Sequence, residues 1–200
     1  MDALIGVDVG QKRDPTAVCA VECERRLVNG RREVHFLVRY LERLAIGTRY
    51  PAVADRVAEI VAAVRKRSVL RRLYVDATGV GLPLVDLLVS RDLGVTVTAV
   101  YFIHGDRWTE VDYQTVHLGK AFLVSRLQML LQCGRIHLPR TPEAEALTAE
   151  LLKYEIRVDE NANDRYGAFK VGTHDDLVTA LGLAVQIDDE ATSGVIRAAW

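Results

Sequence analysis

The order of β-rich and helical segments is the feature that most restricts the fold of this chain. Three segments rich in β-branched residues come first, at 3–9, 16–23 and 33–43, and the turn-forming pair Asn29-Gly30 separates the last two. Such a pair between two apolar runs predicts a β-hairpin. The start of the chain is therefore expected to form three antiparallel strands.

After these strands, the apolar pattern alternates between helical and extended periods. Apolar residues recur at helical spacing over 50–66, and an almost continuously apolar run at 95–102 indicates a strand covered on both faces. Residues 103–117 are expected to be a polar loop. The other expected elements are strand 72–76, helices 82–89, 118–131, 141–152 and 173–187, and a hairpin of 154–158 with 166–171. This order predicts an α/β fold with a mixed sheet flanked by helices.

The composition indicates a folded and soluble protein. The chain has 200 residues, a net charge of −1 and 50% hydrophobic residues, which suits one globular domain and excludes a disordered chain. No apolar run is long enough to span a membrane, and the first residues lack the basic start of a signal peptide. We expect a cytoplasmic location without membrane contact. Three scattered cysteines, Cys19, Cys23 and Cys133, give no zinc motif.

Four aspartates stand where functional groups collect in such sheets. Asp8 and Asp76 end two apolar strands, and Asp175 and Asp176 come at the start of the last helix. Each has an ordinary alternative role, since a strand-end Asp often forms a turn and acids suit a helix N-terminus. With Thr173 as N-cap, both late acids would occupy the first helical turn.

Together, these acids indicate a metal site. Carboxylates that meet at one end of a sheet repel one another unless divalent cations neutralise them, and an all-oxygen set favours Mg²⁺ or Mn²⁺ over zinc. Helical spacing places Asp176 in the apolar column of the last helix and predicts that it faces the sheet. Asp175 is the candidate for a second ion or a solvent role. His174 is either a neighbour of the site or a polar residue at a helix start.

Three segments resemble one known family when taken together. GVDVGQKRDPTAV, YVDATGVG and GTHDDLVTALGLAV are similar to segments of the nuclease domain of bacteriophage or prophage large terminase subunits, and they occur in the same order. That domain belongs to the ribonuclease H-like superfamily. The resemblance covers about 3–187. It implies a sheet of three antiparallel strands followed by parallel strands, flanked by helices, with an extra β-hairpin before the last helix.

The resemblance also implies a site and a reaction. Asp8, Asp76, Asp175 and Asp176 would coordinate two divalent ions, Mg²⁺ or Mn²⁺, and the chain would be an endonuclease that hydrolyses double-stranded DNA during viral genome packaging. The implied partners are DNA, the terminase motor domain, the small terminase subunit and the portal. The isolated domain is expected to be monomeric.

A complete large terminase also contains an ATPase motor, whose phosphate-binding motif is missing here. The single Gly-Lys pair, Gly119-Lys120, is followed by Ala121 rather than Ser or Thr. We therefore expect a nuclease domain over 1–188, a weakly structured tail over 189–200 and no motor domain.

Basic residues near the acids are candidate DNA contacts. Lys12 and Arg13 follow the first strand, and Lys120 begins a predicted helix. The expected hairpin resembles the β-hairpin near the family's active site and carries or adjoins Lys153, Arg157, Arg165 and Lys170. Each of these residues is equally interpretable as a solvated surface charge.

Three other functions fit parts of the pattern. A resolvase-like or transposase-like nuclease would use the same carboxylates on another DNA substrate. An actin-like or sugar-kinase-like ATPase also begins with a strand ending in Asp-x-Gly, here Asp8-Val9-Gly10, but such proteins need the fold twice. A non-catalytic docking module is the third alternative, and the self-repelling acids count against it.

Overall fold

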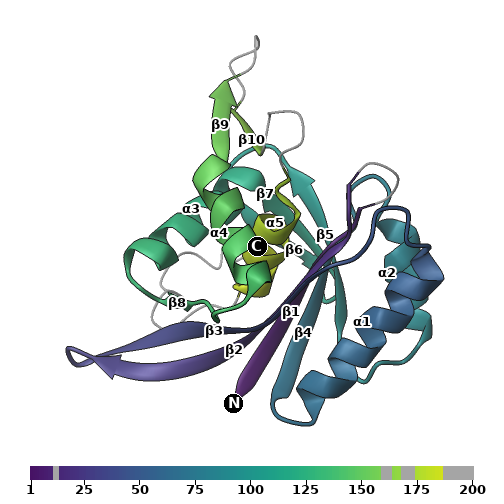
Figure 1. The fold of residues 1–200 in the computed structure, drawn as a ribbon, viewed down its shortest axis with the longest axis horizontal. Helices are drawn as coiled ribbons and strands as arrows, with labels where there is room; N and C mark the ends of the chain where they lie inside the picture. Colours follow the sequence, from purple (N-terminus) through teal and green to yellow (C-terminus); the bar gives the residue numbers. More distant parts are fainter. Residues whose placement is uncertain (11–13, 159–163, 168–173, 187–200) are drawn as a thin grey trace, which may run out of the picture.

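One large sheet organises the chain. The structure, a computed structural model, describes residues 1–10, 14–158, 164–167 and 174–186, and for 155–158 and 164–167 it describes only the backbone. Eight of the described strands form one sheet in the order β6-β7-β5-β4-β1-β2-β3-β8 (Figure 1). Among the described residues, no helix has the length and apolar character needed to cross a membrane.

The first three strands are antiparallel, as predicted. They are β1 (Asp2–Asp8), β2 (Ala17–Val28) and β3 (Arg31–Arg43). The β2–β3 turn has positive φ at Asn29 and Gly30, 50° and 78°, a conformation that Asn and Gly adopt most readily. Both strands run further towards this turn than their apolar residues indicate, so that β2 and β3 form a long two-stranded ribbon.

The other half of the sheet is mostly parallel. Strand β4 (Val69–Asp76) pairs with β1, β5 (Val97–Ile103) pairs with β4, and β7 (Thr115–Gly119) pairs with β5. Strand β6 (Trp108–Asp112) runs antiparallel to β7, and the short β8 (Ile136–His137) runs parallel to β3.

The expected polar loop over 103–117 is therefore wrong. It contains β6 and the start of β7, whose outer residues are too exposed to give an apolar pattern.

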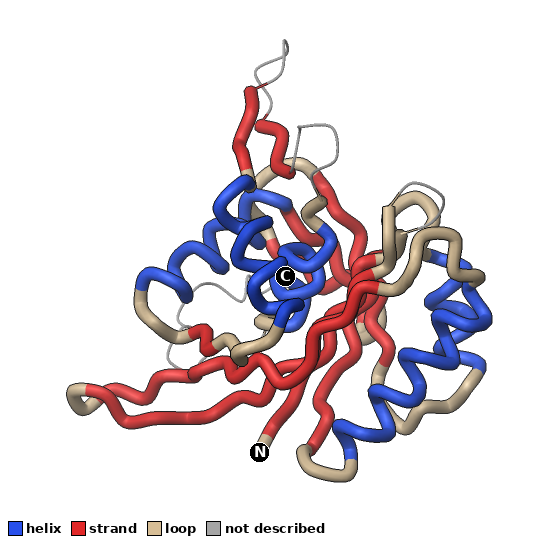
Figure 2. Tube along the Cα trace, in the orientation of Figure 1, coloured by secondary structure: helices blue, strands red, loops and turns tan. Residues whose placement is uncertain are grey.

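Helices cover both faces of the sheet (Figures 1 and 2). Helices α1 (Tyr50–Arg65) and α2 (Leu82–Ser90) pack on one face. Helices α3 (Lys120–Gln132), α4 (Pro142–Lys153) and α5 (Asp176–Ala184) pack on the other. The side chains of β1 alternate between the two cores. Leu4 packs in the core beneath α3, α4 and α5, and Ile5 packs in the core beneath α1 and α2.

A glycine in β1 allows α5 to approach the sheet closely. A Cβ added at Gly6 would lie 2.2 Å from the carbonyl oxygen of Ala180 and 2.7 Å from the amide nitrogen of Ala184. Any larger residue would push α5 away from the strand. Gly6 lies two residues before Asp8, the last residue of β1. The contact therefore sets the position of α5 close to this end of the strand.

The extra hairpin before the last helix is confirmed. Strands β9 (Glu155–Val158) and β10 (Asp164–Gly167) are antiparallel to each other and form a separate two-stranded sheet. The last helix is shorter than predicted, since it begins at Asp176 and ends at Ala184. Thr173 and Ile187, the predicted ends of this helix, and the predicted tail lie outside the described residues.

Candidate active site

Asp8 and Asp76 end two neighbouring parallel strands. Val7 of β1 lies beside Val75 of β4 in register, so the next residue of each strand is a carboxylate at the same edge of the sheet. Carboxyl ends of parallel strands are the usual place for functional groups in open α/β sheets. The sequence prediction that these two acids meet at one end of the sheet agrees with this register.

The turn after Asp76 is held by short hydrogen bonds. The amide of Thr78 donates to Oδ1 of Asp76 (2.8 Å), and the amide of Phe102 donates to the hydroxyl of Thr78 (2.8 Å). A Cβ at Gly81 would lie only 1.8 Å from the carbonyl oxygen of Asp76, so this turn requires glycine. One oxygen of Asp76 is thus occupied and oriented by the backbone.

Asp176 and Asp175 begin α5 in different environments. Asp176, the first helical residue, is 4% exposed, whereas Asp175 is the N-cap, is half-buried and makes no side-chain capping bond. The helical spacing predicted this difference. The helix starts two residues later than the alternative with Thr173 as N-cap would set it.

The charges at this edge of the sheet destabilise one another. Burial raises the pKa of Asp8 well above its ordinary value, and the negative charges of Asp76, Asp176 and Asp175 raise it further. Burial also raises the pKa of Asp76, although hydrogen bonds from Thr78 oppose the shift. The pKa of Asp176 is raised to about 6 by burial, against the opposing charges of Arg43 and His174. An added cation would stabilise all three carboxylates.

Glu150 and Arg43, which were not predicted from the sequence as site residues, support the start of α5. Glu150 of α4 is 7% exposed, and its Oε2 accepts hydrogen bonds from the amides of Leu177 (3.1 Å) and Val178 (3.3 Å). Arg43, at the end of β3, donates to the other oxygen of Glu150. The available signal was Glu150 itself, since it follows Ala144 and Leu147 at three-residue spacing on the buried face of α4.

The structure places two of the predicted neighbours beside the acids. Lys120 is exposed at the first position of α3, with Nζ 5.4 Å from the centroid of the Phe102 ring, and its charge lowers the pKa of both Asp8 and Asp76. Nδ1 of His174 lies 3.6 Å from Oδ2 of Asp176.

Several of the predicted DNA contacts are not placed. Lys12, Arg13 and Lys170 lie outside the described residues, and Arg157 and Arg165 are described only as backbone of β9 and β10. Lys153 is exposed at the end of α4. These residues remain sequence predictions.

The acids suit a hard divalent cation in their donor atoms and charge. Oδ2 of Asp176 is buried and has no hydrogen-bond partner among the described residues, so this oxygen is available to a ligand. Within the described part of the chain, no three His, Cys, Asp or Glu side chains yet converge closely enough to hold a metal ion. Oδ2 of Asp176 faces Arg43 and His174, with Nε of Arg43 at 3.4 Å and Nδ1 of His174 at 3.6 Å.

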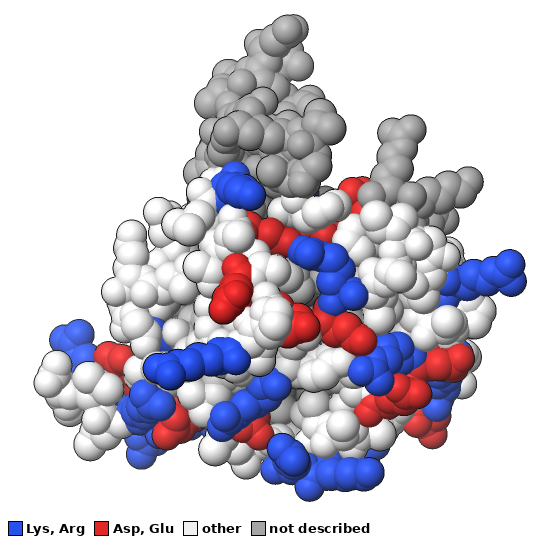
Figure 3. Space-filling view, in the orientation of Figure 1, with Lys and Arg blue, Asp and Glu red and all other residues white. Residues whose placement is uncertain are grey.

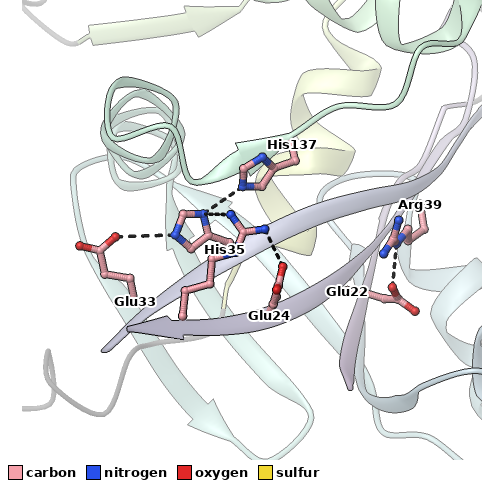
Figure 4. A network of polar contacts seen from close by, with 7 residues as sticks. Glu22, Glu24, Glu33, His35, Arg39 and His137 are labelled. Atoms are coloured by element: carbon pink, nitrogen blue, oxygen red, sulfur yellow. Dashed lines mark hydrogen bonds and ion pairs between the residues drawn. The ribbon is translucent and has the colours of Figure 1, made fainter. Parts of the chain in front are cut away.

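A second polar network lies around His35 of β3, and Nε2 of this histidine has no hydrogen-bond partner among the described residues and lies 3.8 Å from Oε2 of Glu33 (Figure 4). Nδ1 of His35 lies 2.9 Å from Nε2 of His137 and 3.4 Å from Nη1 of Arg26. Nη2 of the same arginine donates to Oε2 of Glu24 at 2.6 Å. Burial lowers the pKa of His35, with the charges of Arg26 and His137 acting in the same direction. This network ties β8 to the β2–β3 ribbon and accounts for a buried histidine without a ligand.

Comparison with solved structures identifies the fold. The nuclease of the phage G20c large terminase with bound cobalt matches with a TM-score of 0.60 and 22% identity, over 91% of this chain and 79% of that chain. The large terminase nuclease domain of bacteriophage SPP1 with bound Mn matches with a TM-score of 0.53 and 14% identity, over 92% and 85%. The HK97 bacteriophage large terminase matches with a TM-score of 0.59 and 14% identity, over 92% of this chain and 38% of that chain.

Comparison of the sequence with known families and proteins finds no match. No protein-family profile matches the chain, and no curated protein matches it in sequence. At the identities of 14% to 22% given above, the structural likeness concerns the fold. The predicted fold class is confirmed, and the chain has the ribonuclease H-like fold of the large terminase nuclease domains.

Proposed function

We propose that this chain is a metal-dependent endonuclease that cleaves double-stranded DNA as the nuclease part of a viral packaging terminase. The observation that carries the proposal is the cluster of mutually repelling acids, in which β1 and β4 end side by side in Asp8 and Asp76, with the charge of the buried Asp176 acting on Asp8. The fold that holds this cluster is that of phage terminase nucleases, some of which were solved with bound magnesium, cobalt or Mn.

Each residue of the site has a distinct task in this proposal. Asp8, Asp76 and Asp176, with Asp175 as the more exposed fourth acid, would hold two ions, Mg²⁺ or Mn²⁺. Such ions supply the Lewis acidity for phosphodiester hydrolysis that none of these side chains provides. Thr78 fixes the orientation of Asp76, and Gly6 sets α5 against β1. Lys120, whose charge reaches Asp8 and Asp76, would bind a phosphate next to the cleaved bond.

The charge distribution favours local over broad DNA contacts. On the face shown in Figure 3, Lys and Arg side chains are interspersed with Asp and Glu and do not form one continuous basic area. A net charge of −1 agrees with this view. DNA would be held mainly at the metal site and at nearby cations such as Lys120, with Lys12, Arg13, Arg165 and Lys170 as further candidates.

The proposal includes the organisation and partners implied by the resemblance. Residues 1–188 would form the nuclease domain, monomeric in isolation, followed by a tail. The motor domain, the small terminase subunit and the portal would act with it in the host cytoplasm. The ATPase alternative gains no support from the structure, because the described residues contain one large mixed sheet and that alternative needs the fold twice.

Plasmid cleavage tests the proposal. The purified chain should nick and then degrade supercoiled DNA in Mn²⁺ or Mg²⁺ and should be inactive in EDTA. A four-way junction cleaved at least tenfold faster than linear duplex would instead favour the resolvase-like alternative. ATP hydrolysis without DNA cleavage would contradict the proposal and favour the ATPase alternative.

A further inference from the structure

Arg43 stands between two buried carboxylates that belong to different parts of the site. Its Nη2 donates to Oε1 of Glu150, and its Nε lies 3.4 Å from Oδ2 of Asp176. The Glu150 and Asp176 side chains are 8% and 5% exposed, and that of Arg43 is 30% exposed. The guanidinium at the end of β3 therefore lies beside both Glu150, which accepts the first amides of α5, and Asp176, the first residue of that helix.

The two contacts of Arg43 differ in kind. Glu150 is fully engaged, with one oxygen towards Arg43 and the other accepting the amides of Leu177 and Val178. In contrast, Nε of Arg43 and Oδ2 of Asp176 are both buried and have no hydrogen-bond partner in the described structure. Glu150 thus anchors the guanidinium, whereas Asp176 is held by charge alone and can leave without breaking a hydrogen bond.

We propose that Arg43 is the internal counter-ion of Asp176, which it holds while the site contains no divalent cation and releases when a cation binds. The inference rests on the proposed function, because it assigns regulation to the same metal site. Since the guanidinium and the metal ion compete for one carboxylate, the positive charge of Arg43 weakens cation binding. The Arg43–Glu150 pair meanwhile keeps the start of α5 in place after Asp176 turns.

A purely structural role for Arg43 makes a different prediction. If Arg43 served only to neutralise the buried Glu150, its removal would leave a buried charge without a partner and would lower stability. Cation affinity would then stay constant or fall as the start of α5 loosened. The direction of the change in metal affinity therefore separates the two roles.

Calorimetric titration with Mn²⁺ in the absence of DNA tests this inference. Arg43→Gln removes the charge and should tighten Mn²⁺ binding about tenfold, a typical coupling between competing ligands. Arg43→Lys keeps the charge and should stay within about threefold of the wild type. Arg39→Gln is the matched control, because Arg39 lies on the same strand and pairs with Glu22 at 2.7 Å (Figure 4). It should leave Mn²⁺ affinity unchanged.

Two further variants control for misfolding and for general effects of the charge change. The double variant Arg43→Met with Glu150→Gln removes the buried ion pair but keeps an oxygen for the amides of Leu177 and Val178, and it should also bind Mn²⁺ more tightly. In an Asp176→Asn background, Arg43→Gln should no longer change the Mn²⁺ affinity, because the carboxylate for which Arg43 and Mn²⁺ compete is absent.

The possible failures are distinguishable. If wild-type binding depends on Asp8 but Arg43→Gln leaves Mn²⁺ affinity unchanged or weaker, the inference about Arg43 is wrong and the proposed function stands. If the wild type binds no Mn²⁺, or Asp8→Asn binds it as well as the wild type does, both the metal site and the role of Arg43 are overturned.

Discussion

The two ends of β1 carry the same residue type in opposite electrostatic settings. Asp2 begins the strand, is 8% exposed and accepts from Arg71 (2.7 Å) and Arg25 (3.0 Å). Burial alone would raise the pKa of Asp2, but the two guanidinium groups hold it below its ordinary value. Asp8 ends the strand, and both burial and neighbouring acids raise its pKa.

The difference separates a carboxylate that stabilises the fold from one to which the proposed function assigns a role in catalysis. The ion pairs of Asp2 join β1 to β2 and β4, and all of its charge is compensated within the protein. Lys120 compensates the charge of Asp8 only in part, and this charge costs stability unless a cation binds. A buried carboxylate that destabilises the folded protein is a candidate functional residue, because it does not contribute to stability.

The largest expected effect separates the two aspartates by activity. Asp8→Asn should reduce Mn²⁺-dependent DNA cleavage by about a thousandfold or more, since it removes a proposed metal ligand. In EDTA, its melting temperature should be unchanged or higher, because a buried charge is removed. Asp2→Asn should leave the cleavage rate within about twofold but lower stability by about 1 to 2 kcal/mol, since Arg25 and Arg71 lose their partner.

Plasmid-nicking rates and thermal melts of both variants check this contrast. An Asp8→Asn protein that cleaves normally would contradict the functional assignment. Marked destabilisation of metal-free Asp8→Asn would make Asp8 a structural residue like Asp2.

A second effect concerns the pH dependence of stability. The folded protein holds a proton on Asp176 up to a pKa of about 6, whereas in the unfolded chain this carboxyl has the ordinary aspartate pKa of 3.8. The stabilising contribution of Asp176 is therefore complete below pH 3.8 and is lost as the pH rises through 6, which amounts to about 3 kcal/mol at most. His35, with its lowered pKa, acts in the opposite direction near pH 6.5.

The comparison with a variant isolates this effect. Urea denaturation in EDTA at pH 5 and pH 7 should show that the wild type loses more stability over this interval than Asp176→Asn does. Saturating Mn²⁺ should remove the difference, because a bound cation favours the ionised form. Equal pH dependence of the two proteins would mean that Asp176 is not destabilised in the folded state.

The smallest effect distinguishes the adjacent acids at the start of α5. Asp176 is buried and raises the pKa of Asp8 more than the half-buried Asp175 does. Asp176→Asn should therefore reduce cleavage about tenfold more than Asp175→Asn. Single-turnover cleavage rates of the two variants provide the measurement, and the reverse order would make Asp175 the main ligand.

Local patterns in the sequence allowed much of this fold to be predicted. Apolar strands that end in Asp8 and Asp76, the turn at Asn29-Gly30 and the column of Asp176 are all readable from neighbouring residues. Strand β6 was missed because most of its residues are exposed and its pairing partner, β7, defines it. The two-residue β8 is too short to leave a periodic signal.

The contacts that complete the site could not be read in the same way. Arg43 and Glu150 are separated by 107 positions, and the packing of α4 against β3 brings them together. A charged residue also has many possible partners in a sequence, whereas an apolar stripe has one preferred environment. The burial of Glu150 on an apolar helix face was nevertheless visible in the spacing of α4.

A crystal of the protein grown or soaked in Mn²⁺ tests the central claim most directly. The account predicts anomalous density between the carboxylates of Asp8, Asp76 and Asp176, with Asp176 turned away from Arg43 and with Asp2 still bound to Arg25 and Arg71. Density absent from this edge of the sheet at saturating Mn²⁺, with Asp176 still facing Arg43, would contradict it.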